Sequence, residues 1–159
     1  MTNQRPSWDD YFMKIAMLVS ERSTCVRHHV GAVIVRDKQL LTTGYNGAVK
    51  TARDCHQLGC LRNALNIPSG TRHEICRAVH AEQNAITQAA NQGININHST
   101  LYCTHSPCII CAKMIVNAGI KRVCAYVGYP DPTFQELFAE CGVVFDLLPR
   151  PDASISILD

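Results

Sequence analysis

Two short motifs in this chain carry side chains that bind metals and move protons. The first is His80-Ala81-Glu82, and the second is Pro107-Cys108-Ile109-Ile110-Cys111. One imidazole and two thiolates supply three ligands to a tetrahedral zinc, and water can take the fourth position, as it does in catalytic sites. The chain therefore has to fold so that two segments far apart in the sequence meet at one metal.

Composition favours one cytoplasmic domain. The chain has 159 residues, of which 47% are hydrophobic, so we expect a single domain over residues 1–159 with its core at about 7–148. A net charge of +2 and an aromatic content of 6% argue against a nucleic-acid partner. No apolar run has the length of a signal peptide or a membrane span, so we expect a soluble protein with no membrane partner.

Apolar periodicity predicts alternating helices and strands. Helices are expected at about 7–23, 80–91, 108–118 and 134–141, and strands at about 30–35, 40–45, 100–104, 122–126 and 143–147. The first two strands would form a hairpin around residues 36–39. Ser7 would cap the first helix. The apolar residues of this helix would form one buried face: Trp8, Tyr11, Phe12, Ile15, Leu18 and Val19. This order predicts an α/β fold whose sheet is covered on both faces.

Residues 46–79 show no sustained periodicity, and a compact domain rarely holds so long a loop without something that organises it. The nine cysteines are better explained as metal ligands and buried thiols than as a disulfide framework, because no secretory signal is present. Cys103, Cys124 and Cys141 lie in or beside apolar runs and are expected in the core. His105 adjoins the second motif and could line a pocket.

The spacing of the ligands indicates where they lie on their helices. His80 and Glu82 are two residues apart, so they belong at a helix N-terminus with the metal beyond it. Cys108 and Cys111 share one face at the start of another helix, and the positive ends of both helices favour thiolates there. Glu82, which is not a ligand, is then the proton acceptor of a hydrolytic reaction. The alternative, a structural zinc finger, would need a fourth protein ligand.

An H-x-E motif followed by P-C-x-x-C is the signature of zinc-dependent nucleobase deaminases. With Gly44-Tyr45-Asn46-Gly47 and the stretch 79–86 added, the chain resembles the deoxycytidylate (dCMP) deaminases of the cytidine deaminase superfamily. The resemblance implies a three-layer α/β/α fold with a central five-stranded mixed sheet. It also implies conversion of dCMP to dUMP and ammonia for thymidylate synthesis, in homohexamers that dCTP activates and dTTP inhibits.

The resemblance also assigns roles to single residues. Asn46 would bind the sugar, and the backbone around Ala81 and Ser106 would hold the pyrimidine edge. The segment Gly44-Tyr45-Asn46-Gly47 would border the effector site, although by itself it is more typical of a glycine-rich turn at a strand end.

A second, non-catalytic zinc is implied by similar microbial and phage enzymes. The candidate ligands cluster around the loop 46–79, and four of the five would bind the metal: Cys25, Cys55, Cys60, His73 and Cys76. Cys25 and Cys55 match the pattern best, Cys76 is the next candidate, and Cys60 or His73 could complete the set. Such a site would stabilise the loop. The alternative is a set of buried free thiols.

Two other functions remain open from the sequence. One is deamination of another free base or of a base within a nucleic acid, which would call for a basic or aromatic surface. The other is a catalytically silent nucleotide-binding or competence-related module, against which the intact Glu82 argues.

Overall fold

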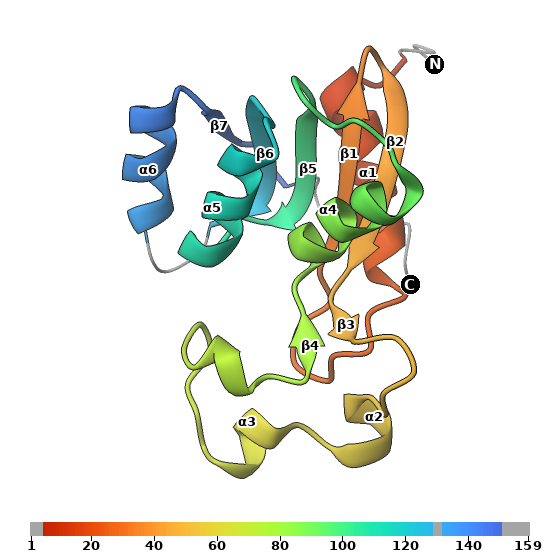
Figure 1. Cartoon of the computed structure of the whole chain (residues 1–159), viewed down its shortest axis with the longest axis vertical. Helices are drawn as coiled ribbons and strands as arrows, with labels where there is room; N and C mark the ends of the chain where they lie inside the picture. The colour runs from red at the N-terminus through yellow and green to blue at the C-terminus, as the bar shows by residue number, and fades with distance from the viewer. Residues whose placement is uncertain (1–4, 129–131, 151–159) are drawn as a thin grey trace.

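A five-stranded mixed sheet forms the centre of the molecule. The computed structural model describes residues 5–128 and 132–150, and its main sheet has the order β2-β1-β5-β6-β7 (Figure 1). The strands are β1 (Gly31–Arg36), β2 (Gln39–Tyr45), β5 (Thr100–His105), β6 (Arg122–Val127) and β7 (Val144–Leu147). β1 is antiparallel to both of its neighbours, whereas β5, β6 and β7 are parallel to one another. The expected mixed sheet is therefore confirmed.

Helices cover both faces of the sheet. One face packs against α1 (Trp8–Ser20), and the other lies beneath α4 (Ala81–Gln92), α5 (Ile109–Asn117) and α6 (Thr133–Cys141) (Figure 1). Along β1, Ala32 and Ile34 pack on the α4 side, whereas Val33 and Val35 pack on the α1 side. A strand buried on both faces is apolar throughout, which explains the continuous run in the sequence. The predicted three-layer α/β/α architecture is confirmed.

The hairpin between β1 and β2 has a tight two-residue turn. Asp37 and Lys38 have φ angles of 51° and 61°, as a type I′ hairpin requires at both central positions. Both strands consequently extend one residue further toward the turn than the sequence predicted, to Arg36 and from Gln39.

The helix α1 begins as predicted, but its buried face differs. The Ser7 side chain caps the helix by accepting a hydrogen bond from the Asp10 N–H at 3.0 Å. The buried residues are Phe12, Met13, Ala16 and Ser20. Trp8, Tyr11 and Leu18 were expected in the core and are exposed, because the apolar residues of α1 extend around more of the helix than the sheet can cover. No helix among the described residues has both the length and the apolarity to cross a membrane.

The core prediction was also wrong for one cysteine. Cys103 and Cys124 are fully buried in β5 and β6, but Cys141 is exposed. It is the last residue of α6, beyond the turns where Phe134 and Phe138 pack on the sheet. The apolar pattern of the sequence does not indicate at which residue the end of a helix extends beyond the core.

Residues 46–79 form a small lobe below the sheet in Figure 1. Its elements are β3 (Gly47–Ala48), α2 (Cys55–Leu58), α3 (Leu61–Ala64), a 3-10 turn η1 (His73–Ile75) and β4 (Ala78–Val79), with β3 paired to β4. These elements have two to four residues each, which is too short to produce a periodic pattern. The unstructured loop expected from the sequence is therefore replaced by a lobe of short elements.

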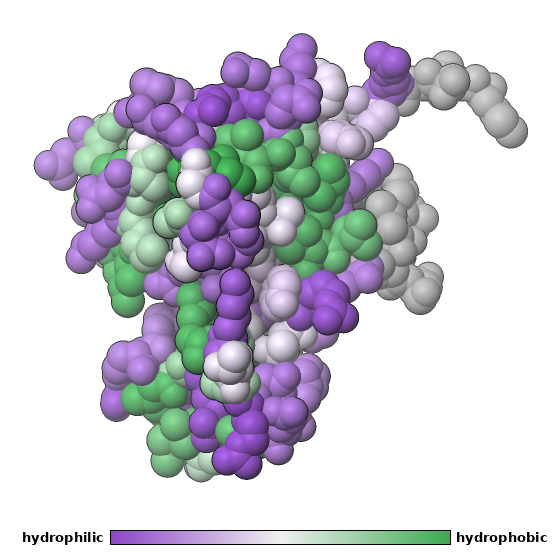
Figure 2. Space-filling view, turned by 45° about the vertical axis from the view of Figure 1, so that its right-hand side comes forward, coloured by the Kyte–Doolittle hydropathy of each residue, from purple (hydrophilic) through white to green (hydrophobic). Residues whose placement is uncertain are grey.

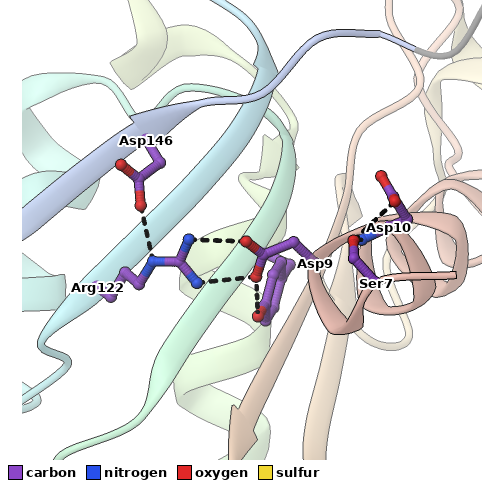
Figure 3. A network of polar contacts seen from close by, with 6 residues as sticks. Ser7, Asp9, Asp10, Arg122 and Asp146 are labelled. Atoms are coloured by element: carbon purple, nitrogen blue, oxygen red, sulfur yellow. Dashed lines mark hydrogen bonds and ion pairs between the residues drawn. The ribbon is translucent and has the colours of Figure 1, made fainter.

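A polar network holds α1 to the sheet (Figure 3). The Arg122 guanidinium donates two hydrogen bonds of 2.8 Å to the Asp9 carboxylate and one of 2.7 Å to Asp146. The Tyr102 hydroxyl donates to Asp9 at 2.7 Å. Hydrogen bonding to Arg122 lowers the pKa of Asp9, and the two-point contact fixes the orientation of α1.

Candidate functional site

The starts of α4 and α5 converge beside the lobe. His80 and Cys108 are the N-cap residues, with ψ angles of 156° and 167°. An N-cap side chain folds back over the first turn of its helix, and Cys108 Sγ accepts a hydrogen bond from the Cys111 N–H at 3.5 Å. Both His80 and Cys108 thus lie at helix starts, where their spacing predicted them. The His80 N–H donates to the Gln83 side chain at 3.0 Å, which fixes the backbone that carries the imidazole.

Three potential metal ligands meet at this point. His80 Nδ1 lies 3.4 Å from Cys111 Sγ and 3.6 Å from Cys108 Sγ. A tetrahedral zinc with bonds of about 2.0 Å to nitrogen and 2.3 Å to sulfur holds such atoms about 3.5 Å apart. The donor set and its spacing therefore fit zinc. Among the described residues, this is the single group of three or more His, Cys, Asp or Glu ligand atoms within 4.8 Å of one another.

The two thiols differ in acidity. A hydrogen bond from the Cys111 thiol, with a second contribution from His80, lowers the pKa of Cys108. The same hydrogen bond and burial raise the pKa of Cys111. One thiolate is thus already favoured, and binding a metal would release the proton of the other.

The Glu82 carboxyl is buried next to these ligands. It lies in the first turn of α4 and is 4% exposed. Burial raises the pKa of Glu82 to about 7, although the charge of His80 opposes this shift. A carboxyl group with a pKa near neutrality can both accept and return a proton.

A pocket of about 300 Å³ opens onto this group. The residues expected to bind the substrate all lie in its wall: Asn46, Ala81 and Ser106. His105 lines the pocket as well, as its position in the sequence suggested. The remaining residues of the expected effector segment, Gly44, Tyr45 and Gly47, are not in the wall.

The Asn46 side chain supports the backbone around the pocket. Its Oδ1 accepts hydrogen bonds from the Ser23 hydroxyl at 2.6 Å and the Val30 N–H at 2.9 Å. Its Nδ2 donates to the His28 carbonyl at 2.8 Å. Sequence reasoning assigned Asn46 to the sugar alone and did not anticipate these contacts, because no sequence pattern reports a side chain that binds distant backbone groups.

Gly44 has a packing role in the structure. A Cβ atom there would lie 2.3 Å from the Ala81 carbonyl oxygen and 2.4 Å from the Ala85 nitrogen. Both are backbone atoms of α4, so glycine is what allows this helix to approach β2 so closely.

The five candidates for a second zinc all line the pocket: Cys25, Cys55, Cys60, His73 and Cys76. No three of them come within 4.8 Å of one another. The pKa of Cys55 is raised mainly by burial, and the charges of Cys60, Cys25 and Cys76 raise it further. His73 instead packs its ring edge-on against His80, with 4.7 Å between the centroids.

Sequence reasoning did not find the cationic side of the pocket. Arg27, His28 and Arg62 lie in its wall, and none of them belongs to a recognisable motif. Their proximity depends on the path of the lobe, which has no periodic signal. The hint in the sequence was their position beside cysteines, Arg27 near Cys25 and Arg62 near Cys60.

Comparison with known proteins identifies the family. The profile of the cytidine and deoxycytidylate deaminase zinc-binding region matches residues 6–127. The chain belongs to this deaminase family. A deoxycytidylate deaminase of Schizosaccharomyces pombe is 37% identical over 95% of the chain and 47% of its own length. ComE operon protein 2 of Bacillus subtilis is 41% identical over 90% of the chain and 72% of its own length. The chain thus spans about half of the yeast relative.

A solved structure of the deaminase family supports the fold assignment. The dCMP deaminase of cyanophage S-TIM5, in complex with dCMP and dUMP, has a TM-score of 0.76 and 31% identity to this chain. The match covers 92% of this chain and 100% of the phage protein. Both the family resemblance and the α/β architecture expected from the sequence are confirmed.

Proposed function

We propose that this protein is a zinc-dependent hydrolase that converts dCMP to dUMP and ammonia. The observation that carries the proposal is the meeting of His80 Nδ1 with the Cys108 and Cys111 sulfurs at a spacing suited to zinc, beside a buried carboxyl. The phage relative crystallised with dCMP and dUMP supports the choice of substrate.

In this proposal His80, Cys108 and Cys111 would hold zinc, which supplies a Lewis acid that activates water for attack. Glu82 accepts the proton of the attacking water and delivers it to the ring nitrogen beside the amino-bearing carbon. It then moves a second proton from the hydroxyl group added to the ring carbon to the amino group on the same carbon, so that the C–N bond breaks, ammonia leaves and a carbonyl remains. The backbone around Ala81 and Ser106 would orient the pyrimidine edge, and Asn46 would bind the sugar; what supports these roles is that all three residues line the pocket.

Ammonia release from a panel of substrates tests this function. We expect release from dCMP well above that from cytosine, cytidine, dCTP and guanine. Preference for guanine or for cytosine would replace the proposed reaction with another deamination. No release from any compound by zinc-replete protein would favour a catalytically silent module.

We also propose a second zinc, bound by Cys25, Cys55, Cys60 and Cys76. What supports it is that all four line the pocket and that the charges of the other three act on Cys55. The contact of His73 with His80 supports leaving His73 out of this set. Four thiolates suit a closed structural site.

The second zinc leads to a prediction about metal content. Purified protein is expected to hold two zinc ions per chain, and Cys55→Ser to hold one, with a marked loss of thermal stability because metal binding contributes directly to folding. Elemental analysis and thermal melting measure both effects. Cys141→Ser is the matched control, since Cys141 is exposed and far from the lobe in sequence. One zinc in the unmutated chain would reduce the four cysteines to free thiols.

We further propose a homo-oligomer, a hexamer by resemblance, that dCTP activates and dTTP inhibits. Exposed Trp8, Tyr11 and Leu18 on α1 support self-association, because exposed apolar patches often mark interfaces. Figure 2 shows hydrophobic surface on the sheet-bearing body, below a hydrophilic rim.

Kinetics of the oligomer test this regulation. The dCMP rate is expected to be sigmoidal in substrate, to become hyperbolic with dCTP and to fall with dTTP, since each effector must prefer one of two states. Hyperbolic kinetics that neither nucleotide changes, measured on protein shown by light scattering to be oligomeric, would contradict the proposal.

A further inference from the structure

Asn84 joins α4 to the two chain segments that enter the site. Its Nδ2 donates to the Tyr45 carbonyl at 2.7 Å and lies 3.5 Å from the Val79 carbonyl. Tyr45 directly precedes Asn46, and Val79 directly precedes His80. One amide group thus contacts both the residue before the proposed sugar-binding side chain and the residue before a proposed metal ligand.

The two contacts of Asn84 differ in strength. Hydrogen bonds from N–H to oxygen are about 2.7–3.2 Å long in proteins, so the bond to Tyr45 is well formed and the 3.5 Å contact with Val79 is marginal. The backbone next to the metal has other support, because the His80 N–H donates to Gln83 and β4 pairs with β3. Asn84 therefore acts chiefly on Tyr45.

Local helix propensity does not explain an asparagine at this position. Asn84 is partly buried in the first turns of α4 (Ala81–Gln92). Asparagine is less favourable than alanine inside a helix, because its side chain competes for backbone hydrogen bonds. A residue that disagrees with its local propensity often serves a functional site. The bond to Tyr45 is the compensating contact here.

The neighbouring Asn46 is bound on its other side to the segment 24–30. The Thr24 N–H donates to the Asn46 carbonyl at 3.2 Å, and the Asn46 N–H donates to the Val30 carbonyl at 3.1 Å. The His28 carbonyl takes one of the two N–H groups of Asn46 Nδ2, so the second can donate to a ligand in the pocket that Asn46 lines. None of these bonds reaches α4, which carries the proton acceptor of the proposed reaction.

We propose that Asn84 is a positioning residue that holds Asn46 at the separation from Glu82 that a pyrimidine deoxynucleotide requires. The inference rests on the proposed function and makes it more specific. A substrate that meets Glu82 with its ring and Asn46 with its sugar must span the distance between them. Loss of the bond to Tyr45 would leave Glu82 on its helix but would release Asn46 from it, so substrate affinity would fall more than the rate of the chemical step.

Steady-state kinetics of Asn84→Ala and Asn84→Asp test this role. Both substitutions remove the N–H donor; alanine favours the helix, and aspartate keeps the shape of asparagine. We expect KM for dCMP to rise about 5- to 10-fold, as for the loss of one hydrogen bond, while kcat and zinc content stay close to wild type. Thr42→Val is the matched control, because the Thr42 hydroxyl also joins β2 to α4, donating to the Ala85 carbonyl at 3.1 Å, but lies outside the pocket wall. It should lower the melting temperature and leave KM unchanged.

A double-mutant cycle shows whether Asn84 acts through Asn46. Asn46→Asp keeps an oxygen acceptor for Ser23 and Val30 but has no N–H for the sugar. Adding Asn84→Ala to Asn46→Asp should raise KM no further, whereas two independent effects would multiply. Multiplied effects would contradict the proposal.

Calorimetric titration with dUMP provides a readout that does not depend on turnover. The Kd of the zinc-replete protein for dUMP should rise about 5- to 10-fold in Asn84→Ala, as for the loss of one hydrogen bond, and stay unchanged in Thr42→Val. If the protein deaminated no dCMP, the proposed function would fail, yet this selective loss of dUMP affinity would still support the positioning role. Unchanged KM and Kd in both Asn84 variants would overturn it. So would loss of zinc from Asn84→Ala, which would assign Asn84 to the support of His80.

Discussion

Glu82→Gln is expected to keep its zinc and to lose dCMP deamination by at least about 10²- to 10⁴-fold. The amide has the shape of the carboxyl, so the buried site, 4% exposed at this residue, should remain intact. Glutamine cannot accept a proton from the attacking water or return it to the ring. Positioned proton transfer contributes about 10²–10⁴ to a rate, and Glu82 performs more than one transfer in the proposed reaction.

Elemental analysis and ammonia release on the same preparation measure the two parts of this prediction. Glu136→Gln is the matched control, because Glu136 is exposed on α6. That variant should retain wild-type metal content and turnover. Near-normal turnover in Glu82→Gln with a full complement of zinc would show that the proton acceptor is another group.

The sequence predicted that His80, Cys108 and Cys111 would meet, because the geometry of each motif is local. Each ligand lies within four residues of a helix start, and the two-residue and three-residue spacings restrict where the side chains can point. The helix caps at Ser7, His80 and Cys108 lie where the motifs indicate. The sheet followed from the alternation of apolar strands and helices.

The cationic side of the pocket could not be predicted in the same way. Arg27 and Arg62 bind backbone carbonyls of residues 67 and 68, and carbonyls are present at every position, so no residue type marks the partner. The contact between His73 and His80 could not be predicted either, because it depends on the turn η1, which has no periodic signal in the sequence. The prediction of the buried face of α1 was wrong for another reason. Trp8 and Leu18 fit the helical periodicity of apolar residues, but the sheet does not extend far enough to cover them.

Gly44→Ala is expected to impair both stability and catalysis. The added methyl group would meet the Ala81 carbonyl oxygen at 2.3 Å and the Ala85 nitrogen at 2.4 Å, and helix backbone cannot move aside as a flexible side chain can. Overpacking of this kind costs about 1–3 kcal/mol, or a fall in melting temperature of about 2–12 °C at 2–4 °C per kcal/mol. The displaced segment carries His80 and Glu82, and a shift of about 1 Å in such groups can lower turnover about 10²-fold.

Gly31→Ala is the matched comparison on the opposite face of the sheet. Its Cβ would lie 2.0 Å from the Ala16 carbonyl oxygen and 2.5 Å from the Ser20 nitrogen, both in α1, which carries none of the proposed site residues. We expect Gly31→Ala to lose stability but to keep turnover per folded molecule, whereas Gly44→Ala loses both. The two are compared by thermal melting and by dCMP turnover below both melting temperatures. If Gly44→Ala kept its stability and basal turnover and lost only its response to dCTP and dTTP, Gly44 would belong to the effector site that the sequence suggested. Loss of basal turnover would instead mean that Gly44 serves catalysis by letting α4 pack against β2.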